Sequence, residues 1–240
     1  MDNKVILQSR PFSTGLGYDV VAYEPDATVA DYERAVEDFF TQARWTVLRQ
    51  SKQEQQGWDH CFGCPLCCSE RIPLTIGDVV RLVSALPGKD EHNSFVRSRD
   101  LEEVLRTFAQ IDCLGGAVDI TLKRNEEGQC ILFDKQRNCC RHHALRPLVC
   151  RTFFCSFLSH RAEKLRLRLI NAGEDELVRI NLRLNLLPDL LQEKVSIEDY
   201  PTTTWSAGYN LDQDKFSKDI ESIVQLEPFT VSLGLVRLNR

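Results

Sequence analysis

Apolar and polar positions along the chain follow two periods, and these periods predict helices and strands. A spacing of three to four residues predicts an amphipathic helix over residues 29–50. A second helix is expected in PLTIGDVVRLVSAL, where Thr75 is the N-cap and Asp78, three residues on, completes a capping box. A third helix is expected over residues 99–112, capped by Ser98.

Alternation of apolar and polar residues predicts strands in other segments. YDVVAY near the N-terminus and FTVSLGLVRL at the C-terminus both alternate in this way. AVDITLKR and QCILFD, separated by NEEG, predict a β-hairpin. KLRLRLI and LVRINLRLNLL also alternate, which favours strands, although their leucine and arginine content suits helices as well. This mixture of elements predicts the α+β class.

Composition and charge exclude several classes of protein. The chain has 240 residues, of which 42% are hydrophobic, so it can bury a core without crosslinks. Its net charge of −5 argues against a general nucleic-acid binder. It contains no apolar run long enough to span a bilayer. The opening MDNKVILQSRPFSTG lacks the basic-then-apolar layout of a signal peptide, so we expect a cytoplasmic protein.

Ten cysteines change this picture, because most of them are clustered. DHCFGCPLCC places four thiols in eight residues, and NCCRHHALRPLVCRTFFC places four more in a second stretch. In a reducing compartment such clustering indicates metal binding or thiol chemistry rather than a disulfide framework. Cys113 stands alone and is expected to be a small buried hydrophobe.

The first cluster has the spacing of a metal-binding turn. Cys61-x-x-Cys64-x-x-Cys67 matches the first three positions of a bacterial ferredoxin run, but Arg71 stands where the fourth cysteine would be. A fourth ligand then has to come from the later cysteines. The neighbouring side chains of Cys67 and Cys68 must diverge. Either two metal sites lie on opposite sides of this segment, or one thiol of the pair is structural or reactive.

The metal ligands are expected among eight cysteines, which would fill two four-thiolate sites or serve one site with some to spare. These are Cys61, Cys64, Cys67, Cys68, Cys130, Cys140, Cys150 and Cys155. Zinc and an iron–sulfur cluster both remain open, and the ferredoxin-like triple favours iron–sulfur. His60, His142 and His143 are further candidate ligands, since they lie beside the cysteines.

The combined motifs resemble the CxxCxxCC family of YkgJ type, a zinc- or iron-chelating family. The resemblance covers about residues 59–155 and rests on CFGCPLCC, on QCILF and on CRHHALRPLVCRTFFC, which contains Arg146, Pro147 and Arg151. It implies a metal- or cluster-binding core, with helices and short β-hairpins packed around the cysteine-rich site. One branch resembles the flagellin lysine N-methylases, which implies S-adenosylmethionine as a cofactor and modification of a protein side chain as an alternative function.

Three functions are therefore possible: an enzyme, a non-catalytic metal module and a thiol redox switch. An enzyme should keep an open coordination position, whereas a structural metal module has a closed site. The Cys-x3-Cys-x2-Cys spacing of radical methyltransferases is missing, and TGLGYDVVAY places its glycines before a strand rather than at a helix start. A thiol redox switch at Cys67–Cys68 or Cys139–Cys140 is the third hypothesis. The sequence leaves open whether the protein is an enzyme.

A basic segment accompanies the second cysteine cluster. Between Lys135 and Arg168 the chain has nine Lys or Arg and one acid, Glu163. This segment is a solvated face, a counter-charge for thiolates, or a site for an anionic ligand or an acidic protein surface. Arg151 is a candidate for neutralising thiolate charge, and Pro147 should hold Arg146 extended.

The expected organisation has three parts. Residues 1–58 form an N-terminal strand and helix segment, residues 59–160 form the metal-chelating domain, and residues 161–240 pack on it. All three can equally belong to one continuous domain.

Overall fold

The computed structural model describes residues 4–13, 15–24, 27–42, 66–89, 98–114, 116–152, 157–188 and 195–200. The α-helices in these ranges are α1 (Val29–Gln42), α3 (Ile76–Leu82), α4 (Ser98–Phe108), α5 (Leu148–Thr152) and α6 (His160–Arg183). The strands are β1 (Val5–Phe12), β2 (Gly15–Tyr23), β3 (Ala109–Leu114), β4 (Ala117–Leu122), β5 (Phe133–Asp134), β6 (Cys139–Cys140) and β7 (Phe157–Leu158). Short 3₁₀-helices are η1 (Leu66–Ser69), η2 (Val83–Ala85), η3 (His143–Leu145) and η4 (Ile197–Asp199).

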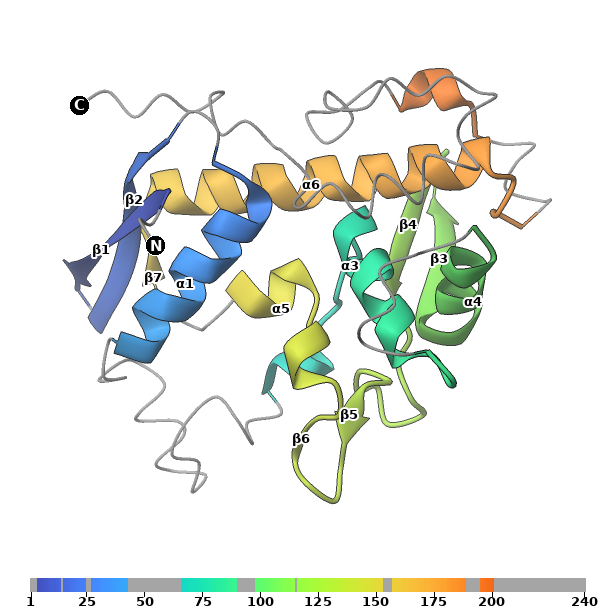
Figure 1. Cartoon of the computed structure of the whole chain (residues 1–240), viewed down its shortest axis with the longest axis horizontal. Coiled ribbons are helices and arrows are strands. Elements are labelled where there is room, and N and C mark those ends of the chain that lie inside the picture. Colours follow the sequence, from blue (N-terminus) through green and yellow to red (C-terminus); the bar gives the residue numbers. More distant parts are fainter. Residues whose placement is uncertain are drawn as a thin grey trace.

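Helices and small sheets thus confirm the predicted α+β class. Helix α6 runs along one side of the molecule, with α3 and α5 packed beneath it (Figure 1). The β1–β2–β7 sheet and α1 lie at one end, whereas the β3–β4 hairpin and α4 lie at the other. No helix in the described ranges is both long and apolar enough to cross a membrane.

The sheet at the N-terminal end has mixed pairing. Strand β1 pairs antiparallel with β2, and β7 adds in parallel, with Gly17 opposite Phe157. A Cβ at Gly17 would lie 2.1 Å from the carbonyl oxygen of Phe157, so this position needs a glycine for the two backbones to approach. YDVVAY is the second half of β2, which confirms the predicted strand.

The predicted N-terminus of α3 is confirmed in detail. The hydroxyl of Thr75 accepts a hydrogen bond from the Asp78 amide, and the Asp78 carboxylate accepts one from the Thr75 amide at 2.8 Å. The helix ends at Leu82 and continues as the 3₁₀-helix η2. In the predicted helix over residues 29–50, α1 covers residues 29–42, and residues 43–50 lie outside the described ranges.

Two predicted boundaries were wrong around residues 99–131. Helix α4 ends at Phe108, and the residues up to Asp112 belong to β3 instead. AVDITLKR pairs mainly with β3. Its predicted partner QCILFD meets it only at one end, through an antiparallel bridge between Arg124 and Cys130 and a 2.8 Å hydrogen bond from the Ile131 amide to the Lys123 carbonyl, and the last two residues of QCILFD form β5 instead. The helix ends early because AQIDCL alternates between exposed and core-facing residues, as a strand does: Gln110 is exposed and Ile111 packs on the core.

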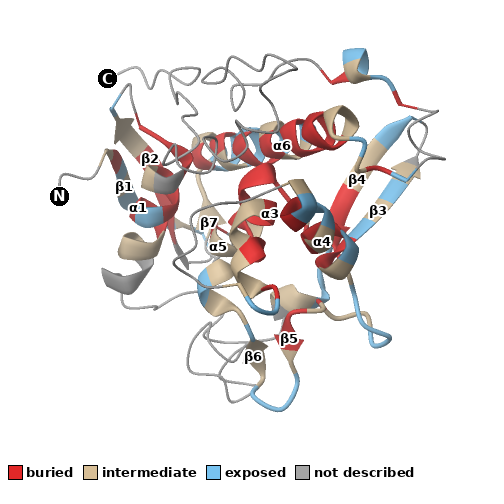
Figure 2. Ribbon diagram, turned by 45° about the vertical axis from the view of Figure 1, so that its right-hand side comes forward, coloured by how far each residue is buried: buried red, intermediate tan, exposed pale blue. Residues whose placement is uncertain are grey.

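The strands favoured in KLRLRLI and LVRINLRLNLL were also wrong, because α6 contains all of KLRLRLI and the LVRINLR part of LVRINLRLNLL. The buried leucines are Leu165, Leu169 and Leu177, which lie on one helical face, and Leu167 between them is 44% exposed. In Figure 2 buried residues recur along α6, separated by intermediate and exposed ones. The predicted C-terminal strand FTVSLGLVRL lies outside the described residues.

Candidate metal centre

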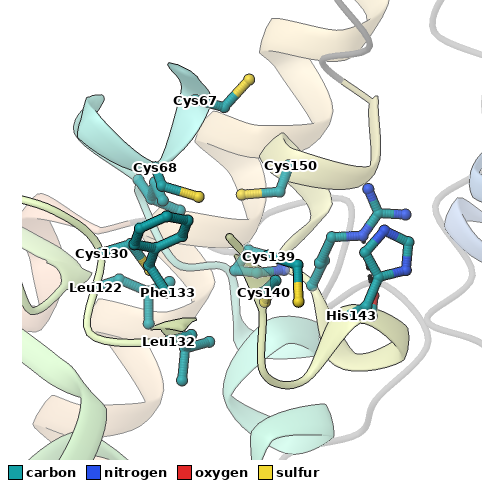
Figure 3. A pocket seen from close by; sticks show the side chains of 13 residues that line it. Cys67, Cys68, Leu122, Cys130, Leu132, Phe133, Cys139, Cys140, His143 and Cys150 are labelled. Atoms are coloured by element: carbon teal, nitrogen blue, oxygen red, sulfur yellow. Dashed lines mark hydrogen bonds between the residues drawn. The ribbon is translucent and has the colours of Figure 1, made fainter. Parts of the chain in front are cut away.

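Six thiols line one cavity of about 60 Å³ beside α5 (Figure 3). Two come from η1, three from the loop and hairpin that follow β4, and one from α5: Cys67, Cys68, Cys130, Cys139, Cys140 and Cys150. The remaining walls include the core side chains Ile72, Leu122 and Leu132, together with Phe133. The cavity is therefore a sulfur-rich space with mostly apolar walls, to which Arg146 and His143 add polar groups.

A backbone hydrogen bond joins the two halves of the cysteine set. The Cys130 amide donates to the Cys68 carbonyl oxygen at 2.6 Å. The β5–β6 hairpin then returns the chain to the cavity, because Phe133 pairs with Cys140 and Asn138 turns with a φ of 51°. These bonds place thiols from distant parts of the sequence on one wall.

Cys150 is positioned by a buried carboxylate from another helix. Helix α5 starts after Pro147, and its first amide, that of Leu148, donates to Asp78 Oδ1 at 2.7 Å. Arg146 is extended, with φ −54° and ψ 138°, as the following proline predicted. The carboxylate that caps α3 thus also fixes the start of the helix that carries Cys150.

Two arginines and two glutamates extend this contact to α1. Arg81 bridges Asp78 at 2.6 Å and Glu33 at 2.7 Å. Arg151 lies 3.7 Å from Glu33 and 2.9 Å from Glu37. Arg151 therefore pairs with carboxylates of α1 and does not line the cavity, contrary to its expected role beside the thiols. The arginine that lines the cavity is Arg146.

The neighbouring thiols of η1 point in different directions, as expected from their adjacency. The sulfur atoms of Cys68 and Cys150 point toward each other, whereas the Cys67 sulfur points away from them (Figure 3). This divergence agrees with the expectation that Cys67 and Cys68 do not bind the same ion.

Burial and mutual repulsion disfavour ionised thiols in this cavity. Burial raises the pKa of Cys130 to about 11, and the neighbouring Cys140 adds to the rise. Burial also raises the pKa of Cys140, against the attraction of Arg146, and raises that of Cys150 well above its usual value. A bound metal ion would reverse this preference, because it stabilises thiolates directly. The donor set therefore fits a thiophilic metal.

The predicted ligands fall into two groups. Cys67, Cys68, Cys130, Cys140 and Cys150 all reach the cavity, while His60, Cys61, Cys64 and Cys155 lie outside the described residues. Among the residues that are described, no three Cys, His, Asp or Glu side chains are close enough together to hold one ion.

Cys139 and His143 also line the cavity, although neither was in the set of eight predicted cysteine ligands. The place of Cys139 beside Cys140 was a signal for it. Burial, followed by repulsion from Arg146, lowers the pKa of His143. A neutral imidazole is the form that binds metals. His142 is not among the lining residues.

Comparison with known proteins gives one match. Neither curated proteins nor solved structures match the chain significantly. Residues 60–170, just under half of the chain, match the CxxCxxCC family model, whose description is "Putative zinc- or iron-chelating domain". The matched region contains all six thiols of the cavity. This part of the chain is therefore similar to a zinc- or iron-chelating domain.

Proposed function

We propose that the protein holds a zinc ion or an iron–sulfur cluster through thiolates from two distant parts of its sequence. The convergence of six thiols on one apolar cavity carries this proposal. Clustered thiols in an apolar shell are costly to ionise, so a metal that binds thiolates supplies the missing stabilisation. Cys61, Cys64 and Cys155 complete the ligand set in this proposal.

The choice between the two metals rests on spacing and charge. The Cys-x-x-Cys-x-x-Cys run favours an iron–sulfur cluster, since bacterial ferredoxins use the same three spacings. A single zinc ion with four thiolates carries a formal charge of about −2, which a nearby cation would offset. Arg146 is that cation here, because it lines the cavity and its charge favours the Cys140 thiolate. Burial has the larger effect, so the pKa of Cys140 is still raised.

The direct test is metal and acid-labile sulfide analysis of protein purified without air, with an absorption spectrum. Iron, sulfide and a broad band near about 400 nm are expected for a cluster, and stoichiometric zinc without colour for a zinc site. Cys64→Ala and Cys150→Ala should each lose bound metal. Cys113→Ala is the matched control, since Cys113 lies on β3 and does not line the cavity.

The outcomes separate clearly. Wild-type protein without stoichiometric metal would contradict the proposal. Full metal retention by Cys64→Ala or Cys150→Ala would remove that residue from the ligand set. Metal loss from Cys113→Ala would show that the assay reports general unfolding rather than ligation.

A further inference from the structure

A second cavity, of about 220 Å³, adjoins the thiol cavity. Cys67 and Cys150 line both, so the two spaces share one wall. Two basic side chains, Arg71 and Arg166, and one acidic side chain, Glu70, line the rest together with apolar residues. None of these three charged residues lines the thiol cavity, so this second space has a different chemistry.

The Asp119 carboxylate on β4 orients the Arg71 guanidinium. Its Nε donates to Asp119 Oδ2 at 3.0 Å, and its Nη2 contacts Asp119 Oδ1. This pair occupies one edge of the guanidinium fork. A carboxylate that grips one edge of an arginine orients the group and lets the remaining N–H donors meet a ligand.

Arg166 brings a second positive charge from α6. Its charge reaches a buried tyrosine pair, Tyr18 and Tyr32, whose hydroxyl oxygens lie 3.3 Å apart. Burial raises the pKa of Tyr18 to about 12, and the attraction of Arg166 opposes part of that rise. Arg166 thus lines the second cavity and is close enough to this interior pair for its charge to act on Tyr18.

The size and charge of the cavity limit what it can hold. Its volume is below the roughly 300–1,000 Å³ of pockets for drug-sized ligands, so a ligand of few heavy atoms fits. Two guanidinium groups match the oxygen atoms of a carboxylate or phosphate. Glu70 opposes an anion, and both Glu70 and Arg71 are exposed, so water and salt screen both charges. The carboxylates of Asp119, Glu174 and Asp112 also act on Arg71, so Arg166 supplies the larger part of the attraction.

We propose that the second cavity binds a small oxyanion, a carboxylate or a phosphate, which pairs with Arg166 and Arg71 and lies against Cys67 and Cys150. Contact between this ligand and a metal rests on the proposed function, whereas anion binding itself does not.

The test is a calorimetric titration of the full chain with inorganic phosphate and, separately, with succinate, at constant ionic strength. Saturable binding of at least one probe is expected. Arg166→Gln should weaken it by about tenfold or more, as the loss of one charged hydrogen-bonding group predicts. Arg168→Gln is the matched control, because Arg168 is exposed on the same helix and lines neither cavity.

Two further variants show whether weaker binding comes from the lost guanidinium or from misfolding. Arg166→Lys keeps the charge without the fork, so its affinity should fall between those of the wild type and Arg166→Gln. Arg71→Gln should also weaken binding. Absence of saturation by both probes, or equal weakening by Arg168→Gln, would overturn the inference.

Metal analysis separates this inference from the proposed function. Metal-free wild-type protein that still binds an anion through Arg166 would support the second cavity and contradict the proposed function. Metal-loaded protein that binds neither probe would support the proposed function and contradict anion binding in the second cavity. Arg166→Gln should retain the metal content of the wild type, because Arg166 does not line the thiol cavity.

Discussion

The Leu148 amide donates a 2.7 Å hydrogen bond to the Asp78 carboxylate, which ties the start of α5 to the start of α3. Asp78 is fully buried and also accepts from the Thr75 amide and hydroxyl and from Arg81. One carboxylate therefore satisfies donors from both helices. The helix that carries Cys150 depends on this contact for its position.

Asp78→Asn should be strongly destabilising. An amide removes the negative charge and leaves Arg81 with Glu33 as its one charged partner among the described residues, and breaking a buried pair costs about 3–5 kcal/mol. Urea unfolding should show a lower midpoint, and metal analysis should show reduced binding, since Cys150 loses its fixed helix start. Asp112→Asn, at an exposed position on β3, should stay within about 0.5 kcal/mol of the wild type. An unchanged midpoint for Asp78→Asn would show that this contact does not stabilise the fold.

Metal removal should lower thermal stability if the thiol cavity is a metal centre. Binding stabilises the folded state by about 4 kcal/mol when free metal exceeds its Kd a thousandfold. For a chain of this length each kcal/mol shifts Tm by about 2–4 °C. A chelator should therefore lower the wild-type Tm by about 8 °C or more, measured by calorimetry.

Cys130→Ser supplies the control for this experiment. The variant keeps the backbone bond from residue 130 to Cys68 but loses the thiol, so the chelator should change its Tm little. An equal fall in both proteins would mean that the chelator acts elsewhere, and no fall in either would argue against a stabilising metal.

Local signals were readable from the sequence, whereas long-range ones were not. The Thr75–Asp78 capping box is confirmed because its partners are three residues apart and need no tertiary context. The role of Asp78 toward Leu148 was hidden, since nothing in either segment alone indicates that the two meet. In the same way the cysteine spacing predicted a split ligand set, but not the bond between Cys68 and Cys130.

Helix α6 was mispredicted for a different physical reason. In KLRLRLI the leucines fall at every second position, which satisfies a strand, while two of them also lie four residues apart, which satisfies a helix. Only packing distinguishes the two periods, because it decides whether Leu167 is buried with its neighbours. The structure leaves it 44% exposed.

This difference can be measured with two matched variants. Leu169 is 2% exposed, so Leu169→Ala should cost about 2–5 kcal/mol in the free energy of unfolding. Leu167→Ala should stay within about 0.5 kcal/mol of the wild type, because its side chain faces solvent. Equal losses in urea unfolding would favour a strand with both leucines on one buried face.

A carboxyl on α6 should make stability depend on pH. Burial raises the pKa of Glu174 to about 7, and the charges of Asp119, Asp175 and Asp78 add to the rise, while Arg71 opposes it. The folded state therefore holds this proton more tightly than the unfolded chain, whose pKa is near 4.5. Stability falls as pH rises from about 4.5 to about 7, and this contribution stays lost above that range.

Glu174→Gln should remove this dependence, because the amide stays neutral at every pH. With a discount for partial exposure, the variant should raise Tm at pH 8 by about 2–4 °C, which corresponds to about 1 kcal/mol. At pH 4.5 and below it should match the wild type, since the wild-type carboxyl is then protonated in the fold. Glu163→Gln, at an exposed position on the same helix, is the control and should change Tm little at either pH. A Glu174→Gln variant that is no more stable than the wild type at pH 8 would show that the attraction of Arg71 outweighs the burial of this carboxyl.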